Sequence, residues 1–377
     1  MIYLDNAATT KPSPALAALW EAYTREKWYN PSALYTPALF VEKEITAARE
    51  RLCQVIGAPH ALFLSGGTEA ANMVAQHGWR KRGSKKLHFI TSMYEHPCVY
   101  ESFRALSAAG HAVDFVKPNK AGVVVPEDVA MLVREDTALV SILHVHNETG
   151  AINDIAAIAK AAKEKNPEAL FYADGVQGFL HVPFSMRNTA VDYYAVSAHK
   201  VHGLKGTGAL FFQANTPLHP FILGGGQEKG LRGGTENTWG IFAFDAAVQA
   251  YQKKQAAYTA HMERLKNHLL AALRALDAVI ITPKDSAPHI VNAAFPGLRG
   301  EVLLHLLEAD HIYIATGSAC SSKNRTGRVH HALGYAQEIA ESVVRISFCP
   351  ENTIEEIDIT IEKIKIAQEK FRGVIRR

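Results

Sequence analysis

The sequence predicts an α/β protein with one large, mostly parallel β-sheet covered by helices, followed by a smaller α+β domain. Two patterns support this fold class. Continuous apolar runs alternate with helical segments over most of the chain, which is typical of parallel strands buried on both faces. From Val279 onward, shorter strands and helices alternate in a second pattern. We expect the helical stretch 238–275 to cross between the two parts.

The composition is that of a globular protein. Of 377 residues, 48% are hydrophobic, which is enough for a large core in roughly two to three domains. The net charge of +3 is too small to indicate a nucleic-acid groove or a membrane-surface patch. No apolar run reaches the roughly 20 residues of a membrane helix, and the N-terminus lacks signal-peptide features. We therefore expect a cytoplasmic protein that binds neither membranes nor nucleic acid directly.

The N-terminal region is predicted to be a short extended piece followed by two helices. Ser13 and Pro14 have the residue types of an N-cap and a first helical position. A second helix is expected to start at Thr36, where Pro37 follows, and to end at Gly57.

The remaining elements follow the two patterns described above. Strands of the large sheet are predicted at 61–64, 87–90, 112–116, 138–143, 169–172, 191–196 and 208–212, with helices at 97–109, 126–134 and 153–165. The smaller domain is predicted to have strands at 290–294, 312–315 and 343–348, and helices at 301–308 and 353–371. Ligands of such sheets bind at the carboxyl ends of the strands. Residues suited to chemistry follow successive strands: Thr68, Glu95, His96, His146, Asn147, Glu148, Asp174 and Lys200.

The stretch 191–208 is the most suggestive of chemistry. An apolar run stops at Ser197-Ala-His199-Lys200, and glycines follow. A lysine at the end of a buried strand is desolvated, which lowers the pKa of its amine and suits a Schiff base with a carbonyl group. The alternative is a lysine that ends the strand and reaches water, and that reading is favoured for Lys200 considered alone.

Two further segments change that balance. The sequence Ser-Gly-Gly-Thr-Glu at 65–69 joins a strand to a helix, a geometry that offers backbone N–H groups to a phosphate, although many such connections contain glycines. Asp174 precedes Lys200 by 26 residues, and an aspartate beside a pyridine nitrogen keeps pyridoxal phosphate protonated. Taken alone, Asp174 is better read as an N-cap. The ordered combination is more specific than any member of it.

The four cysteines, Cys53, Cys98, Cys320 and Cys349, form no C-x-x-C pair. No histidine pair has the spacing of a zinc site, so no metal site and no structural disulfide are predicted. Each thiol is either a packed small residue or a reactive group.

The motifs identify a family resemblance that covers nearly the whole chain. They lie at 3–10, 30–32, 65–69, 95–96, 147–150, 174–177, 197–200, 225–228, 232–235, 317–321 and 345–347. With these motifs the sequence resembles cysteine desulfurases of the class V aminotransferase superfamily, which are pyridoxal-phosphate-dependent enzymes of fold type I. The resemblance implies a large domain at 15–255 and a small domain formed by 1–14 and 256–377.

The resemblance also implies roles for individual residues. Lys200 would form the Schiff base, Asp174 would pair with the pyridinium nitrogen, Gln177 would contact the phenolic oxygen, and His96 would stack on the ring and move protons. Gly67, Thr68, Ser197 and His199 would hold the phosphate, with Thr235 from the second subunit of a homodimer; Asn147 and Arg345 would bind the substrate carboxylate, and Asn147 would also contact the cofactor. Cys320 would be the nucleophile, whereas Cys98 and Cys349 are expected to be packed thiols.

The implied reaction converts L-cysteine to L-alanine and leaves the sulfur on Cys320 as a persulfide. The acceptor would be an iron–sulfur scaffold or a tRNA-thiolating enzyme. Another pyridoxal-phosphate reaction, selenocysteine lysis or transamination, is the first alternative, and a scaffold without turnover is the second. The sequence departs from the family pattern at Tyr29, His146, Asn153 and Leu204, which leaves substrate preference and partner choice open.

Overall fold

A seven-stranded sheet forms the centre of the larger part of the molecule. The structure, a computed structural model, describes residues 1–80, 86–316 and 328–372. The strands are β2 (His60–Leu64), β3 (His88–Ser92), β4 (Ala112–Val116), β5 (Thr137–Leu143), β6 (Leu170–Asp174), β7 (Tyr193–Ser197) and β8 (Gly208–Phe212), in the order β2-β8-β7-β6-β5-β3-β4. Six of them run in one direction, and β8 is antiparallel to both its neighbours. The predicted mostly parallel sheet is confirmed.

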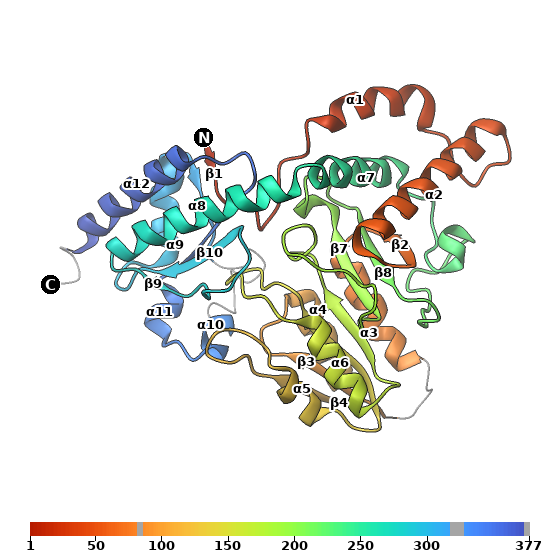
Figure 1. The fold of residues 1–377 in the computed structure, drawn as a ribbon, viewed down its shortest axis with the longest axis horizontal. Helices are drawn as coiled ribbons and strands as arrows, with labels where there is room; N and C mark the ends of the chain where they lie inside the picture. The colour runs from red at the N-terminus through yellow and green to blue at the C-terminus, as the bar shows by residue number, and fades with distance from the viewer. Residues whose placement is uncertain (81–85, 317–327, 373–377) are drawn as a thin grey trace.

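Helices cover both faces of this sheet (Figure 1). The helices of this part are α2 (Thr36–Ile56), α3 (Gly67–Arg80), α4 (Pro97–Ala108), α5 (Pro126–Leu132), α6 (Ile155–Lys165), α7 (Thr238–Gln252) and α1 (Ala15–Ala22), which packs on α7 and not on the sheet. Ile90 and Val140 face the apolar cluster to which α2, α6 and α7 contribute, whereas their neighbours Phe89 and Leu139 face the cluster of α3 and α4. Because successive strand residues point to opposite faces, a strand buried on both sides is apolar throughout.

Helix ends follow their local sequence signals with two differences. α2 starts at Thr36 and ends at Gly57, whose φ of 70° lies in the left-handed region that favours glycine, as predicted. The N-cap of α1 is Pro14 rather than Ser13. The expectation of one helical stretch over 238–275 is wrong, because Lys254 leaves helical geometry, with φ at −123°, between α7 and α8 (Gln255–Ala275). The polar run 252–255 has no apolar side chain to keep the helix on a core.

The second part of the molecule contains two small sheets. β9 (Val279–Ile280), β10 (Ile290–Ala294) and β12 (Val343–Ser347) form an antiparallel sheet, and β1 (Ile2–Tyr3) pairs in parallel with β11 (Ile312–Tyr313). Its helices are α8, α9 (Gly300–Ala309), α10 (Arg328–Ala332), α11 (Gln337–Glu341) and α12 (Ile354–Arg372). Leu4 from the N-terminus packs in the same core as α8, α9 and α12.

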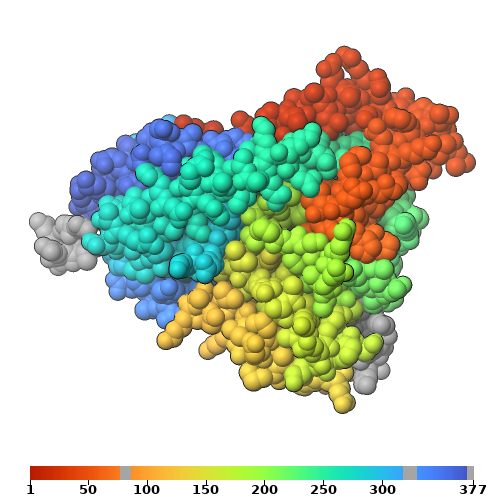
Figure 2. All heavy atoms as spheres, in the orientation of Figure 1, coloured from red at the N-terminus to blue at the C-terminus, as the bar shows by residue number. Residues whose placement is uncertain are grey.

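Figure 2 shows this C-terminal part packed beside the sheet part, with the N-terminal segment running along one edge of both. None of the described helices has the length and apolar character needed to cross a membrane.

Three chain segments approach one another closely at Gly208, the first residue of β8. It pairs with Ser197 at the end of β7 and with Leu64 at the end of β2. A Cβ atom at Gly208 would lie 2.4 Å from the carbonyl oxygen of Val196 and 2.7 Å from the Cα of Gly66. Both neighbours are backbone atoms, so they cannot move aside as a flexible side chain would.

We predict that Gly208→Ala lowers the free energy of unfolding by about 1–3 kcal/mol, because the methyl group overpacks a rigid backbone junction. Urea unfolding checks this. The matched control is Gly226→Ala, where nothing lies within 4 Å of the position that a Cβ would take, and its effect should stay within about 0.5 kcal/mol. Equal effects of the two substitutions would contradict the packing argument.

Candidate active site

A cavity of about 270 Å³ lies at the carboxyl ends of β5, β6 and β7, where parallel sheets bind ligands. Its lining combines residues of the sheet part, the N-terminal segment and the C-terminal part. The lining residues are Ala7, Ala8, Gly67, Thr68, His96, Cys98, Leu143, Val145, Asn147, Asp174, Val176, Gln177, Ser197, His199, Lys200 and Arg345. Among the described residues, the cavity therefore brings together every predicted site residue except Thr235.

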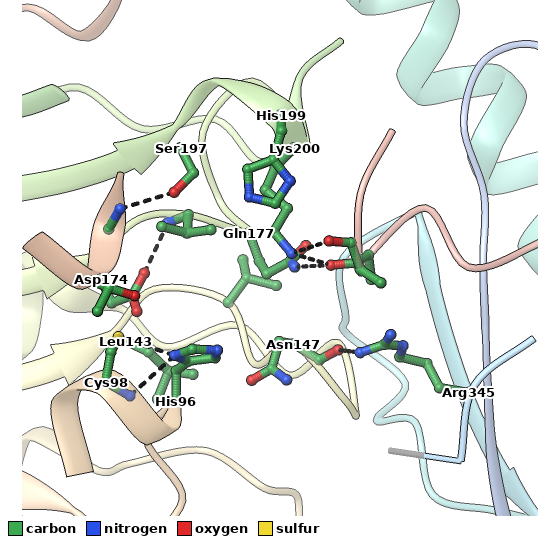
Figure 3. A pocket seen from close by; sticks show the side chains of 16 residues that line it. His96, Cys98, Leu143, Asn147, Asp174, Gln177, Ser197, His199, Lys200 and Arg345 are labelled. Atoms are coloured by element: carbon green, nitrogen blue, oxygen red, sulfur yellow. Dashed lines mark hydrogen bonds between the residues drawn. The ribbon is translucent and has the colours of Figure 1, made fainter. Parts of the chain in front are cut away.

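Lys200 is held by the N-terminal segment. It ends the short 3-10 turn Ala198–Lys200 that follows β7. Its half-buried Nζ donates hydrogen bonds to the carbonyl oxygens of Ala7 at 2.6 Å and Ala8 at 2.8 Å. Thr10 donates from both its backbone N–H and its hydroxyl to the carbonyl of His199. These contacts point the amine across the cavity instead of out to water (Figure 3).

Asp174 is the last residue of β6 and is 6% exposed. Its Oδ1 accepts a hydrogen bond from the backbone N–H of Val176 at 3.0 Å, and a turn follows it. Asp174 thus caps the turn that follows β6, as the N-cap alternative expected, and it also lines the cavity. Burial raises the pKa of the Asp174 carboxyl to about 6, and the opposing influences of the Val176 hydrogen bond and the Lys200 charge are smaller. A cationic group beside this carboxylate would restore its ionised form.

Gln177 has its amide orientation fixed by two partners. Its Nε2 donates to the carbonyl of Ala7 at 2.7 Å, and its Oε1 lies 3.2 Å from Nε2 of His289. Because an amide oxygen only accepts, His289 must carry its proton on Nε2. The ring of His289 stacks on that of His181, with centroids 3.9 Å apart. No motif in the sequence pointed to His289.

His96 and Cys98 begin α4 at the wall of the cavity. The backbone N–H of Cys98 donates to Nδ1 of His96, the N-cap, and Cys98 Sγ lies 3.0 Å from the same nitrogen. Burial, and next the charge of Asp174, raise the pKa of the Cys98 thiol well above its usual range. The expectation of packed thiols is met by Cys349, which is buried, whereas Cys98 is only half-buried and lines the cavity.

An anion site is built at the start of α3. The backbone N–H of Gly67, the first residue of this 14-residue helix, points at Ser197 Oγ, 2.9 Å away. A Cβ at Gly67 would lie 2.7 Å from Val176 Cγ2, so the approach requires glycine. His199 contributes a ring whose Nδ1 bonds to the hydroxyl of Thr9 at 3.1 Å. The N–H groups and dipole of a helix N-terminus favour a phosphate here.

These groups form a donor set that suits pyridoxal 5'-phosphate. One cavity combines the Lys200 amine, a helix start that favours an anion and a buried carboxylate that favours a cation. The phosphate of the cofactor suits the helix start, its carbonyl carbon suits the amine, and its ring nitrogen suits the carboxylate. The residues present therefore fit the group.

Arg345 enters the cavity from β12, opposite Asp174 and Cys98 (Figure 3). It is 2% exposed, and it donates from Nη1 to the carbonyl of Asn147 at 2.8 Å and from Nη2 to Oδ1 of Asp5 at 2.6 Å. Its buried Nε has no partner among the described residues. Sequence reasoning missed Asp5, because the ion pair joins positions at opposite ends of the chain.

Of the remaining two predicted residues, only Thr235 is described by the structure, and it does not line this cavity. Thr235 lines a second cavity of about 240 Å³ together with Arg232 and Asn237. Cys320 lies outside the described residues. Among the departures from the family pattern, His146 stacks on Tyr94, and its Nδ1 accepts the backbone N–H groups of Glu148 and Thr149.

Comparisons with known proteins identify the family of the chain. The aminotransferase class-V family model matches residues 2–360. A cysteine desulfurase IscS of Dictyoglomus turgidum is 32% identical, with 99% of this chain and 96% of the relative covered. A NifS/IcsS protein homolog of Lactobacillus delbrueckii is 37% identical over 95% of this chain and 94% of its own.

Solved structures are similar over the same extent. A NifS-like protein superposes with a TM-score of 0.92 at 35% identity, covering 98% of this chain and 99% of its own. SspA in complex with cysteine gives a TM-score of 0.81 at 28% identity, covering 94% of this chain and 100% of its own. The fold is thus that of the pyridoxal-phosphate enzymes of fold type I, and the chain belongs to the class-V aminotransferase family, within its cysteine desulfurases.

Proposed function

We propose that this chain converts L-cysteine to L-alanine and takes the sulfur as a persulfide on Cys320. The observation that carries the proposal is the convergence of Lys200, Asp174 and Arg345 on one cavity. An amine, a buried carboxylate and a buried guanidinium are what a cofactor carbonyl, a ring nitrogen and an amino-acid carboxylate require.

Pyridoxal 5'-phosphate is the proposed cofactor. Bound through Lys200, it supplies an electron-accepting ring that stabilises negative charge on the α-carbon of the substrate. The residues assigned to it are Lys200, Asp174, Gln177, His96, Asn147, Gly67, Thr68, Ser197 and His199, with Thr235 contributed by a second copy of the chain in a homodimer. The orientation of Gln177 leaves its Nε2 as a donor beside Lys200, which suits the phenolic oxygen.

The side chains of this protein then bind the substrate and move its protons. Arg345 and Asn147 hold the carboxylate, for which a planar guanidinium is well shaped. The Lys200 amine, once released, takes the α-proton, and His96 exchanges a proton with the leaving part of the substrate. The Cys320 thiolate attacks the substrate sulfur, so that the carbon–sulfur bond breaks and a sulfur–sulfur bond forms. Cysteine and the thiol become alanine and the persulfide, and no outside oxidant is needed.

The organisation of the chain follows from this assignment. We assign the cofactor to a large domain at 15–255 and the sulfur-carrying cysteine to a small domain formed by 1–14 and 256–377. The sulfur acceptor would be a protein, either an iron–sulfur scaffold or a tRNA-thiolating enzyme, in the cytoplasm.

We predict that Cys320→Ala lowers alanine formation from L-cysteine by at least about 1,000-fold, because the variant lacks the sulfur nucleophile. The visible absorbance of the bound cofactor should be unchanged. Alanine and sulfide are measured in the presence of a thiol reductant, and Cys349→Ala is the matched control with normal activity expected. Full activity of Cys320→Ala would show that sulfur leaves by another route.

The raised pKa of Asp174 predicts how cofactor binding depends on pH. Its carboxyl is ionised above about 6 and neutral below. A neutral carboxyl cannot pair with a protonated ring nitrogen, so cofactor affinity should fall as the pH is lowered through about 6. Equilibrium titrations of the cofactor-stripped chain with pyridoxal 5'-phosphate measure this.

The control for this prediction is Asp174→Asn, which should bind the cofactor more weakly at neutral pH. Its affinity should keep only the pH dependence of the phosphate group, which titrates near pH 6. If the variant and the wild type gave parallel profiles, Asp174 would not be the group that titrates.

A further inference from the structure

Three metal-ligating side chains meet on one wall of the cavity. A ring nitrogen of His96, the Sγ of Cys98 and a carboxylate oxygen of Asp174 all lie within 4.8 Å of one another. Two of them come from the start of α4 and the third from the end of β6 (Figure 3). In the part of the chain that the structure describes, no other group of three such residues occurs.

We propose that His96, Cys98 and Asp174 bind a divalent metal ion of the Zn²⁺ class when the cavity holds no cofactor, and that this ion excludes the cofactor. An imidazole, a thiolate and a carboxylate are ligands that Zn²⁺ prefers, and three protein ligands leave one position for water. The thiolate and the carboxylate together carry two negative charges, which a divalent ion neutralises.

Two of the three ligands already stand close to the spacing that such an ion needs. Zinc lies about 2.0 Å from nitrogen and about 2.3 Å from sulfur, so two such ligands of a tetrahedral site stand roughly 3.5 Å apart. His96 Nδ1 and Cys98 Sγ are 3.0 Å apart. An increase of about 0.5 Å would bring this pair to zinc-site spacing, with loss of the Cys98 N–H bond to Nδ1, and the Asp174 oxygen lies within 4.8 Å of Sγ and of a ring nitrogen of His96. Pro97 between these residues starts α4 and restricts the backbone that carries both.

The expected exclusion rests on the proposed function, because His96 and Asp174 are also assigned to the cofactor. An ion on these residues would cover the face that the ring needs and would occupy the carboxylate that pairs with its nitrogen. Cys98 differs from the other two, since it has no assigned part in cofactor binding or turnover. A change at Cys98 therefore separates the metal site from the reaction.

The test is metal binding by the full-length chain after removal of its cofactor. Calorimetry with Zn²⁺ should give one ion per chain, and Co²⁺ should give a thiolate-to-cobalt charge-transfer band. Cys98→Ala should remove the band and weaken Zn²⁺ binding by at least about 100-fold, because even residues that only support a ligand are worth 10- to 100-fold. Cys320→Ala and Cys349→Ala are the matched controls and should bind Zn²⁺ normally.

Competition is tested by adding pyridoxal 5'-phosphate to the Zn²⁺-loaded chain. The cofactor absorbance should appear slowly, a chelator should restore its normal rate, and Zn²⁺ should have no effect on Cys98→Ala. Unchanged Zn²⁺ binding by Cys98→Ala, or its loss in Cys320→Ala, would overturn the site, and simultaneous binding of ion and cofactor would overturn the exclusion. If the enzyme loaded with pyridoxal 5'-phosphate failed to release sulfur from L-cysteine, the proposed function would be wrong. The measured Zn²⁺ binding would not be affected by that result.

Discussion

Hydrogen bonds from the first ten residues hold the two halves of the site together. The carbonyl of Ala7 accepts from both Lys200 Nζ and Gln177 Nε2 on the sheet side. On the other side, the backbone N–H of Ala7 donates to Ser347 Oγ, and Asp5 pairs with Arg345. One short N-terminal segment therefore sets where the amine stands relative to the guanidinium. The positions of cofactor and substrate both depend on it.

Burial shifts the pKa values of two ionisable groups that line the cavity. It raises the pKa of Asp174 to about 6 and lowers that of His199 to about 4, with help from the nearby charges of Lys200 and Lys205. Each group is thus biased toward its neutral form in the protein alone. A ligand with a cationic nitrogen and an anionic phosphate supplies the missing charges. A metal ion that binds the Asp174 carboxylate must compete with the proton that this raised pKa favours.

Much of the site could be predicted from the sequence because of the fold. In a parallel sheet the strand ends meet at one edge, so Thr68, His96, Asp174 and Lys200 could be placed together from their positions after apolar runs. Contacts that depend on packing between distant segments could not be predicted: His289 orients Gln177, and Asp5 binds Arg345, with no local signal in either case. The break between α7 and α8 differs from these contacts, because the polar run 252–255 is visible in the sequence.

Transfer of the cysteine sulfur to Cys320, on a protein whose cofactor is anchored at Lys200, is the step on which the proposed function depends. Mass spectrometry of the intact, cofactor-loaded protein after brief exposure to L-cysteine, followed by peptide mapping, tests it most directly. We expect one added sulfur, located on Cys320, absent from Lys200→Ala and removed by a thiol reductant. An added sulfur on Cys98, or alanine formation with Cys320 never modified, would contradict this transfer.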